Sequence, residues 1–185
     1  MTASACEPRH QDCYAVMGNP IAHSQSPRIH RLFARQTGQS LGYDALLVER
    51  HGFAQAVAAS QSAGGKGLNI TVPFKQEACE IADELSPRAQ LATAVNTLLI
   101  RDDGTLFGDN TDGVGLVRDL TRNLKLTIAG KGILLLGAGG AARGVLAPLL
   151  EQKPSRLLIA NRTAERAAQL ADSFADLGDL EGCGF

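Results

Sequence analysis

The chain alternates between short apolar runs of strand length and longer stretches whose apolar residues recur at helical spacing. Up to residue 110 this pattern predicts strands over 14–18, 41–48 and 67–70, helices over 26–37, 52–63 and 74–85, and a hairpin formed by 94–100 and 104–108. The turn of the hairpin is predicted at Asp102-Asp103-Gly104. Because strands and helices alternate, we expect an α/β fold with a mostly parallel sheet.

The strongest local signal lies between residues 132 and 160. An apolar run leads into the glycine-rich turn Gly137-Ala138-Gly139-Gly140-Ala141, and a helical pattern and a second strand over 156–160 follow. Glycines at such a turn let backbone N–H groups approach a pyrophosphate at the helix N-terminus. Since the strand before the turn and the helix after it are both present, the segment predicts a Rossmann-type dinucleotide-binding unit rather than a merely structural turn.

The residues after the second strand indicate which dinucleotide binds. An NAD site usually places an Asp or Glu about 20 residues beyond the glycines, where it holds the ribose 2′-hydroxyl. This chain instead has Asn161-Arg162-Thr163, with Arg166 one helical turn further on. Arginine donates hydrogen bonds in a planar fork that suits a phosphate. We therefore predict NADP as the cofactor, while Thr163 also suits a helix N-cap.

The same patterns divide the chain into domains. We expect a disordered tail over 1–13, a first domain over 14–110, a connector helix and linker over 111–130, and part of a Rossmann domain over 131–185. That last part shows only about two strands, half or less of a doubly wound sheet. The predicted architecture is an N-terminal α/β domain followed by an incomplete nucleotide-binding domain.

The composition of the chain limits the kinds of partner that it is expected to bind. Hydrophobic residues make up 44% of the chain and the formal net charge is −1, values that indicate a globular protein without a nucleic-acid partner. No apolar run approaches the roughly 18 residues that would cross a membrane. The four cysteines show no C-x-x-C spacing, which argues against a metal site or disulfide bonds and favours the cytoplasm. His23 and His30 lack partners at metal-ligand spacing and His51 precedes a glycine, so all three are expected at the surface.

Polar side chains gather where strands of the first domain are predicted to end. In open α/β sheets, ligands bind at the carboxyl ends of strands, so these loops are expected to meet at one crevice. Their donors and acceptors suit a polyhydroxylated ligand, and a lysine among them can move a proton. Some also have structural alternatives, because Ser26 and Asp112 suit helix caps, and Asn69 and Asn96 can satisfy backbone groups. The candidates are Ser24, Ser26, Asn69, Thr71, Lys75, Asn96 and Asp112.

Taken in order, six motifs of this chain resemble shikimate dehydrogenase. They are Gly18-Asn19-Pro20-Ile21-x-His23-Ser24-x-Ser26-Pro27, Asn69-Ile70-Thr71-Val72-Pro73-x-Lys75, Ala94-Val95-Asn96-Thr97, Gly108-x-Asn110-Thr111-Asp112-Gly113, the glycine-rich turn, and Asn161-Arg162-Thr163. The resemblance implies reversible, NADPH-dependent reduction of 3-dehydroshikimate to shikimate, a step in chorismate and aromatic amino-acid biosynthesis.

The resemblance also implies a role for each matching residue. Ser24 and Ser26 would hold the substrate carboxylate, and Lys75 and Asp112 would form the catalytic pair. The ring hydroxyls would bind Asn69, Thr71, Asn96 and Asp112. The cofactor would bind Gly137, Ala138, Gly139, Gly140, Ala141, Asn161, Arg162, Thr163 and Arg166, and no metal is implied.

Members of that family are considerably longer than this chain, so we expect a fragment of such an enzyme. One alternative is a quinate/shikimate dehydrogenase. Quinate carries an extra hydroxyl beside its carboxylate, so the loop of Ser24 and Ser26 would decide between the two substrates. Another is a non-catalytic module that binds a shikimate-like ligand. The oligomeric state, monomer or homodimer, stays open at this point.

Overall fold

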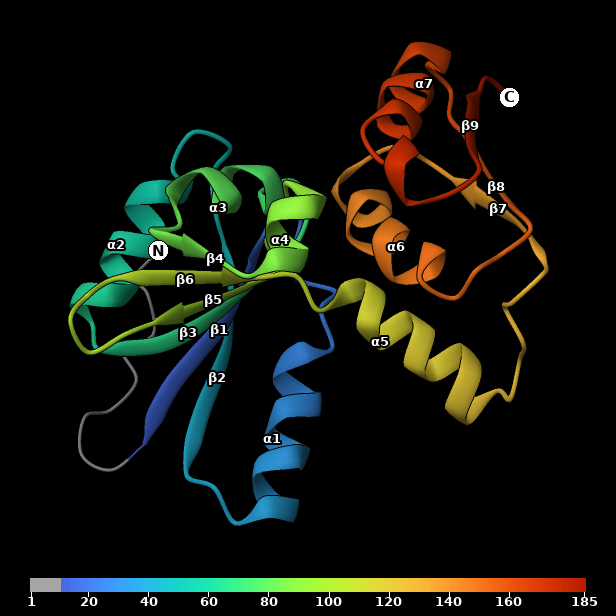
Figure 1. Cartoon of the computed structure of the whole chain (residues 1–185). Coiled ribbons are helices and arrows are strands. Elements are labelled where there is room, and N and C mark those ends of the chain that lie inside the picture. The colour runs from blue at the N-terminus through green and yellow to red at the C-terminus, as the bar shows by residue number, and fades with distance from the viewer. Residues whose placement is uncertain (1–10) are drawn as a thin grey trace. The chain divides into compact units, whose positions relative to one another are not determined.

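A computed structural model gives the structure of residues 11–185 (Figure 1). The described residues form two compact units. The first holds the chain up to Ser86 together with Val95–Asp109, and the second holds Pro87–Ala94 together with Asn110–Phe185. Strand β1 begins at Asp12, so the predicted tail is wrong at its last residues, while positions 1–10 lie outside the described residues.

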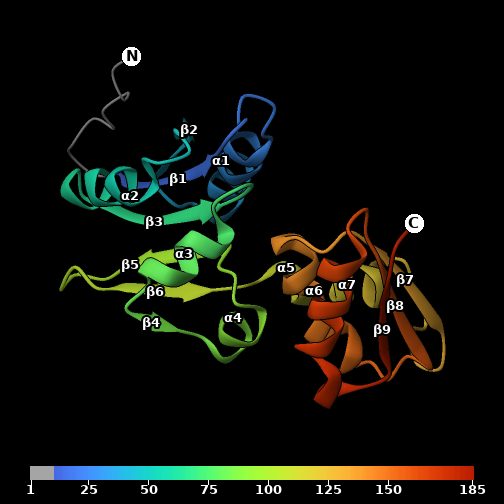
Figure 2. The ribbon, with the colours of Figure 1, turned by 90° about the horizontal axis from the view of Figure 1, so that it is seen from above.

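The first unit is built on a six-stranded sheet in the order β2-β1-β3-β5-β6-β4. Strand β1 is parallel to β2 and β3, β5 is antiparallel to β3 and β6, and β4 is parallel to β6. Figure 2 shows β3, β5, β6 and β4 side by side. The strands are β1 (Asp12–Gly18), β2 (Leu41–Leu47), β3 (Gly65–Ile70), β4 (Glu84–Leu85), β5 (Thr97–Ile100) and β6 (Leu106–Asp109), and the helices are α1 (Ser26–Thr37), α2 (Phe53–Ser62) and α3 (Lys75–Ile81). The predicted α/β class with a mostly parallel sheet is confirmed.

Both faces of β1 are buried from Ala15 to Gly18, which explains its apolar run. Neighbouring residues of a strand point to opposite faces, and Met17 is fully buried while Val16 belongs to a separate cluster with Tyr43. The rings of Phe53, from α2, and Phe74, just before α3, stack at 4.9 Å between centroids. The core thus fixes the strand ends from which the polar loops extend.

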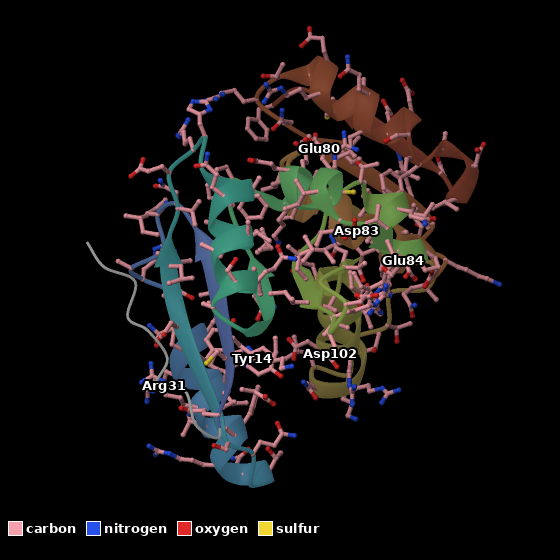
Figure 3. The ribbon with its side chains drawn as sticks, turned by 90° about the vertical axis from the view of Figure 1, so that its left-hand side faces the viewer. Tyr14, Arg31, Glu80, Asp83, Glu84 and Asp102 are labelled. Carbon is pink, nitrogen blue, oxygen red and sulfur yellow. The ribbon has the colours of Figure 1, made fainter. Side chains whose placement is uncertain are left out.

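The predicted helix over 74–85 is too long. Helix α3 ends at Ile81, and Glu84–Leu85 forms the edge strand β4 (Figure 3 labels Asp83 and Glu84). The backbone N–H of Asp83 donates to the carbonyl of Leu106 (2.9 Å), and its carboxylate accepts from the N–H of Leu106 (2.7 Å). These bonds to β6 are made across the sheet, so they override a helical spacing that is only local. Helix α4 (Pro87–Ala92), in the second unit, was also missing from the prediction.

The second unit contains a three-stranded parallel sheet in the order β7-β8-β9. Its elements besides α4 are α5 (Asp112–Arg118), a π-helical turn (Asp119–Asn123), β7 (Gly132–Leu136), α6 (Gly140–Leu150), β8 (Arg156–Ala160), α7 (Ala164–Asp172), a 3₁₀ turn (Ala175–Leu177) and β9 (Leu180–Cys183). Leu146, Leu157 and Phe174 are among the residues of its buried core. The predicted strand–helix–strand unit around the glycine-rich turn is therefore present as β7–α6–β8.

Strand β9 was not predicted, because glycines near a chain end favour loops. Its Gly182 instead lies against helix α7, where an added Cβ would come within 2.3 Å of the carbonyl carbon and oxygen of Ala167. A side chain would push the helix off the strand, so glycine is required by a close approach rather than by a turn.

The expectation that the cysteines form no disulfide bonds is wrong at one position. Cys13 is disulfide-bonded, whereas Cys79 and Cys183 are free thiols. Across residues 11–185, no helix combines the length and the apolar character needed to cross a bilayer.

Candidate functional site

The predicted substrate residues of the first unit lie on or next to the loops at one edge of the six-stranded sheet. The N–H of Thr71 donates to the carbonyl of Met17 (2.9 Å), which joins the loops after β1 and β3. The N–H of Ile70 donates to the carbonyl of Asn96 (2.7 Å), which brings the segment before β5 to the same edge. The structure thus gathers the loops that carry Ser24, Ser26, Asn69, Thr71, Lys75 and Asn96.

The two serines lie on the loop between β1 and α1. Ser26 is the first residue of α1 and Gln25 occupies the N-cap position, so the interpretation of Ser26 as a cap is wrong. The hydroxyl of Ser24 accepts from the N–H of Ser26 at 3.3 Å. The hydroxyl of Ser26 bonds the phenol of Tyr43 on β2 instead of a helical N–H group. Both serines are half-buried.

Lys75 begins α3 and is only 9% exposed. Its backbone carbonyl accepts from the N–H of Val95 (2.7 Å), which holds the start of the helix beside the segment leading to Asn96. Lysines are seldom buried unless their ammonium groups are paired, so this position does not fit a solvated surface lysine. A buried lysine among polar loop residues suits proton transfer.

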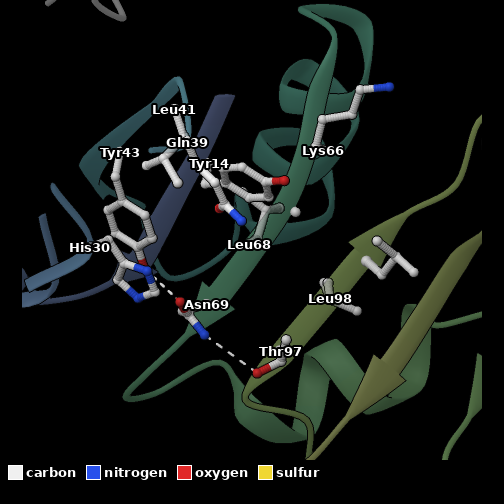
Figure 4. Close-up of a pocket in the computed structure, with 12 residues that line it drawn as sticks. Tyr14, His30, Gln39, Leu41, Tyr43, Lys66, Leu68, Asn69, Thr97 and Leu98 are labelled. Atoms are coloured by element: carbon white, nitrogen blue, oxygen red, sulfur yellow. Dashed lines mark hydrogen bonds between the residues drawn. The ribbon is translucent and has the colours of Figure 1, made fainter. Parts of the chain in front are cut away.

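Side chains of β2, β3 and β5 and of the residue before β5 form a row of hydrogen bonds at the same edge, and Figure 4 shows the bonds from Tyr43 to Asn69 and from Asn69 to Thr97. The phenol of Tyr43 donates to Asn69 Oδ1 (2.6 Å), and Asn69 Nδ2 donates to Thr97 Oγ1 (3.3 Å). Thr97 Oγ1 in turn donates to Asn96 Oδ1 (2.8 Å). Tyr43, Asn69 and Thr97 also line a surface pocket of about 290 Å³. Two of these residues, Tyr43 and Thr97, were not among the predicted site residues.

The surroundings of Tyr43 keep its phenol protonated. Burial raises the pKa of Tyr43 to about 12, and the hydrogen bond with Ser26 opposes that rise. The imidazole of His30 stacks on the ring at 4.1 Å between centroids, and burial lowers the pKa of His30. His30 is therefore half-buried against β2, and the expectation that it lies at the surface is wrong.

Asp112 lies in the second unit, where it begins α5. Its N–H donates to Oδ1 of Asn110 (3.2 Å), and Nδ2 of Asn110 donates to the carbonyl of Ala94 (2.9 Å). Asn110 is 2% exposed, so this amide is a buried link between the segments before α5 and after α4. Thr111 occupies the N-cap position of α5, and Asp112 contributes negative charge to the first turn, where the helix dipole favours it.

The glycine-rich turn of the second unit has the features that a pyrophosphate requires. Gly137 has a φ of +107°, which L-residues with a side chain rarely adopt. No atom lies within 4 Å of a Cβ added at Gly137 or Gly139, so the space above the turn is open. Among the described residues, no side chain caps the N-terminus of α6. Its first N–H groups therefore remain available to an anion.

The candidate 2′-phosphate residues lie beside that turn. Strands β7 and β8 pair in register from Gly132 with Arg156 to Leu136 with Ala160, so Gly137 and Asn161 follow directly at the same edge. Asn161 Nδ2 donates to the carbonyl of Thr163 (2.9 Å), which orders the turn into α7. Arg162 and Arg166 are exposed at this edge, as are Thr163 and the helix start that it precedes.

The fold and these two edges define a class: an α/β protein with a Rossmann-type dinucleotide-binding unit and a separate polar, lysine-containing site. Residues 16–98 match the family described as shikimate dehydrogenase substrate binding domain, and residues 119–180 match shikimate / quinate 5-dehydrogenase. The chain belongs to the shikimate dehydrogenase family.

Individual relatives agree with this assignment. The shikimate dehydrogenase (NADP(+)) of Methylococcus capsulatus is 60% identical over 174 residues, which cover 94% of this chain and 62% of that protein. An Ael1 enzyme from Pseudomonas putida is similar in structure, with a TM-score of 0.83 at 47% identity over 92% of this chain and 62% of the other. Shikimate 5-dehydrogenase from Thermus thermophilus, solved in complex with NADP(H) and shikimate, gives a TM-score of 0.83 at 34% identity over 92% and 63%. The chain thus spans about 62% of the length of the curated relative.

Proposed function

We propose that this chain carries the substrate site and part of the cofactor site of an NADP-dependent shikimate dehydrogenase, which reversibly reduces 3-dehydroshikimate to shikimate. The observation that carries the proposal is the burial of Lys75 at the sheet edge where the serine, threonine and asparagine loops meet. The relatives' names give the reaction, and the local arrangement of this chain suits it.

Within this proposal the polar loops bind and orient the substrate. The hydroxyls of Ser24 and Ser26 would donate to the carboxylate, since two neutral donors can hold one planar anion. Thr71 and Asn96 would hydrogen-bond the ring hydroxyls, together with Asn69. Lys75 would give a proton to the oxygen that forms when the ketone is reduced, and Asp112 would orient substrate and lysine.

The second unit fits a bound NADP. The open turn at Gly137 and Gly139 and the uncapped start of α6 suit the pyrophosphate, with Ala138, Gly140 and Ala141 completing the turn. Arg162 would pair with the 2′-phosphate, assisted by Asn161, Thr163 and Arg166. When bound, NADPH supplies the hydride, and the chain's own contribution is to position and to protonate.

The test is NADP-dependent oxidation of shikimate, followed by NADPH absorbance. The protein would be this chain joined to the remaining C-terminal part of the Methylococcus capsulatus relative. We expect turnover in this chimera and a loss of about 10²-fold or more in kcat for Lys75→Met. Lys66→Met is the matched control, because Lys66 lies on β3 but is exposed and paired with Asp102. A folded chimera that binds shikimate without reducing NADP would favour the non-catalytic binding module instead.

A second candidate is a quinate/shikimate dehydrogenase, which the description of the family matching residues 119–180 favours. It is tested in the same assay by comparing kcat/KM for quinate and shikimate. We further propose a cytoplasmic, homodimeric protein, which cell fractionation and sedimentation of the chimera would test.

A further inference from the structure

We propose that Tyr43 and Thr97 are positioning residues of the substrate site, which act through a directed chain of hydrogen bonds to set the amide of Asn96 for a substrate hydroxyl. This inference rests on the proposed function, because it assigns Asn96 to substrate binding. It adds two residues that neither the motifs nor the comparisons assign.

A backbone carbonyl fixes the donor-to-acceptor direction of these side-chain hydrogen bonds. Asn69 Nδ2 lies 3.4 Å from the carbonyl oxygen of Asn96, which can only accept. The nitrogen of the Asn69 amide must therefore face β5, and its oxygen must face Tyr43 at 2.6 Å. A flipped amide would place two acceptors against each other at the β5 end. The arrangement requires Tyr43 to be the donor, and its raised pKa keeps the phenolic proton in place across the physiological range.

The orientation of the Asn69 amide also determines the orientation of the Asn96 amide. Asn69 Nδ2 also donates to Thr97 Oγ1 at 3.3 Å. Because Thr97 Oγ1 is the acceptor in this bond, the single proton of its hydroxyl is left for another acceptor. It goes to Asn96 Oδ1 at 2.8 Å. The oxygen of the Asn96 amide is thereby turned toward Thr97, which fixes the side of the amide on which its NH₂ group lies.

This arrangement changes the expected role of Asn69. Its NH₂ group makes two contacts and its oxygen accepts from Tyr43, so most of its hydrogen-bonding capacity is used within the protein. We therefore assign Asn69 a supporting role toward Asn96 beside its proposed contact with a ring hydroxyl. The bond between Ser26 and Tyr43 extends the support to the loop that would hold the carboxylate.

The phenol can be removed without disturbing the packing. The Tyr43 ring is 4% exposed and stacks on His30, and Tyr43→Phe keeps both features. Tyr14 offers a matched control because it pairs directly with Tyr43 in the sheet and lines the same pocket, outside the hydrogen-bonded chain. Thr97→Val removes the other hydroxyl, and Thr97→Ser retains it.

The experiment measures steady-state kinetics of the chimera described above with shikimate and NADP. We expect Tyr43→Phe and Thr97→Val each to raise the KM for shikimate by about 5- to 10-fold, with kcat within about threefold of the parent, because each loses one hydrogen bond of the support. Thr97→Ser restores the parent KM, and Tyr14→Phe leaves it unchanged. Circular dichroism confirms that the variants fold.

Two results would overturn the proposal. One is an unchanged KM in folded Tyr43→Phe and Thr97→Val. The other is an equal rise in KM in Tyr14→Phe, which would mean a general effect on the sheet. Failure of the proposed function is recognised separately, because the parent chimera itself would then show no turnover.

Discussion

Replacing Gly113 by alanine is expected to destabilise the second unit, although alanine is the better helix former. Gly113 is the second residue of α5 and is buried where that helix packs on α6. A Cβ at this position would lie 2.4 Å from the carbonyl oxygen of Gly144 and 2.7 Å from Cγ of Pro148. The first contact is with backbone, which cannot rotate away, so the two helices would have to separate.

The net effect follows from two opposing contributions. Alanine gains about 1 kcal/mol over glycine in a helix interior. Overpacking costs about 1–3 kcal/mol, and a rigid backbone contact belongs at the upper end of that range. We therefore expect a net loss of about 2 kcal/mol, which lowers the melting temperature of a unit of this size by roughly 10 °C. Gly115→Ala is the matched control, because no atom lies within 4 Å of its added Cβ and only the helix-forming gain remains.

The assay is thermal unfolding of the 185-residue chain, followed by circular dichroism. Tyr14 and Tyr43 are its only tyrosines and both lie in the first unit, so tyrosine fluorescence follows that unit separately. We expect Gly113→Ala to lower the transition seen by circular dichroism and Gly115→Ala to raise it slightly. If Gly113→Ala were as stable as the parent, α5 and α6 would be able to accommodate a Cβ at this position, and the packing argument would be refuted.

Two further predictions concern charge. Arg162→Asp should lower kcat/KM for NADP by about 10-fold or more relative to NAD in the chimera, because it exchanges a phosphate partner for a repelling carboxylate; equal losses for both cofactors would contradict the 2′-phosphate role. Tyr43 should ionise near pH 12 in an ultraviolet absorbance titration of the chain, which contains no tryptophan, and Tyr43→Phe should remove that step. Since the folded pKa lies above the unfolded value of about 10, stability is retained below pH 10 and lost as the pH rises toward 12; a step at the ordinary value would show that the phenol is not buried.

The elements that could be predicted from the sequence are those whose local pattern agrees with their tertiary setting. Strand β1 reads as an apolar run because it lies inside its sheet and is buried over its last four residues, and β7 reads as one because its leucines and isoleucine favour strands. The hairpin of β5 and β6 carries its own signal in Gly104, which has a φ of +85°. A turn of this kind depends on neighbouring residues alone, so it can be predicted from the local sequence.

The missed elements depend on partners far away in the sequence. Strand β4 has two residues and exists because the segment around Asp83 pairs with β6. Strand β9 contains Gly182, whose requirement comes from contact with α7. Neither signal is present within a window of neighbouring residues, so a local reading assigns helix to the first and loop to the second.

The residues of the candidate site also fall into those with a local sequence signal and those that depend on distant partners. Residues expected to touch ligand, such as Ser24 and Lys75, stand in polar loops after apolar strands and could be picked out directly. Tyr43 and Thr97 lie within strands and read as ordinary strand residues, because tyrosine and threonine favour strands anyway. The signal that could have found them is the position of Tyr43, Asn69 and Thr97 on the same face of the sheet, and finding it requires the strand order and register.

Glycine near the nucleotide turn has two separate causes, which the motif alone does not distinguish. Gly137 is required by its backbone conformation at the turn. Gly144, further along α6, is required by Asn110, whose amide would lie 2.7 Å from an added Cβ. Because Asn110 also holds the N–H of Asp112, the small residue on α6 serves the start of α5 rather than the nucleotide. The position of Asp112 is thus set by close helix packing within the second unit, so Gly144→Ala should disturb the start of α5 rather than the nucleotide turn.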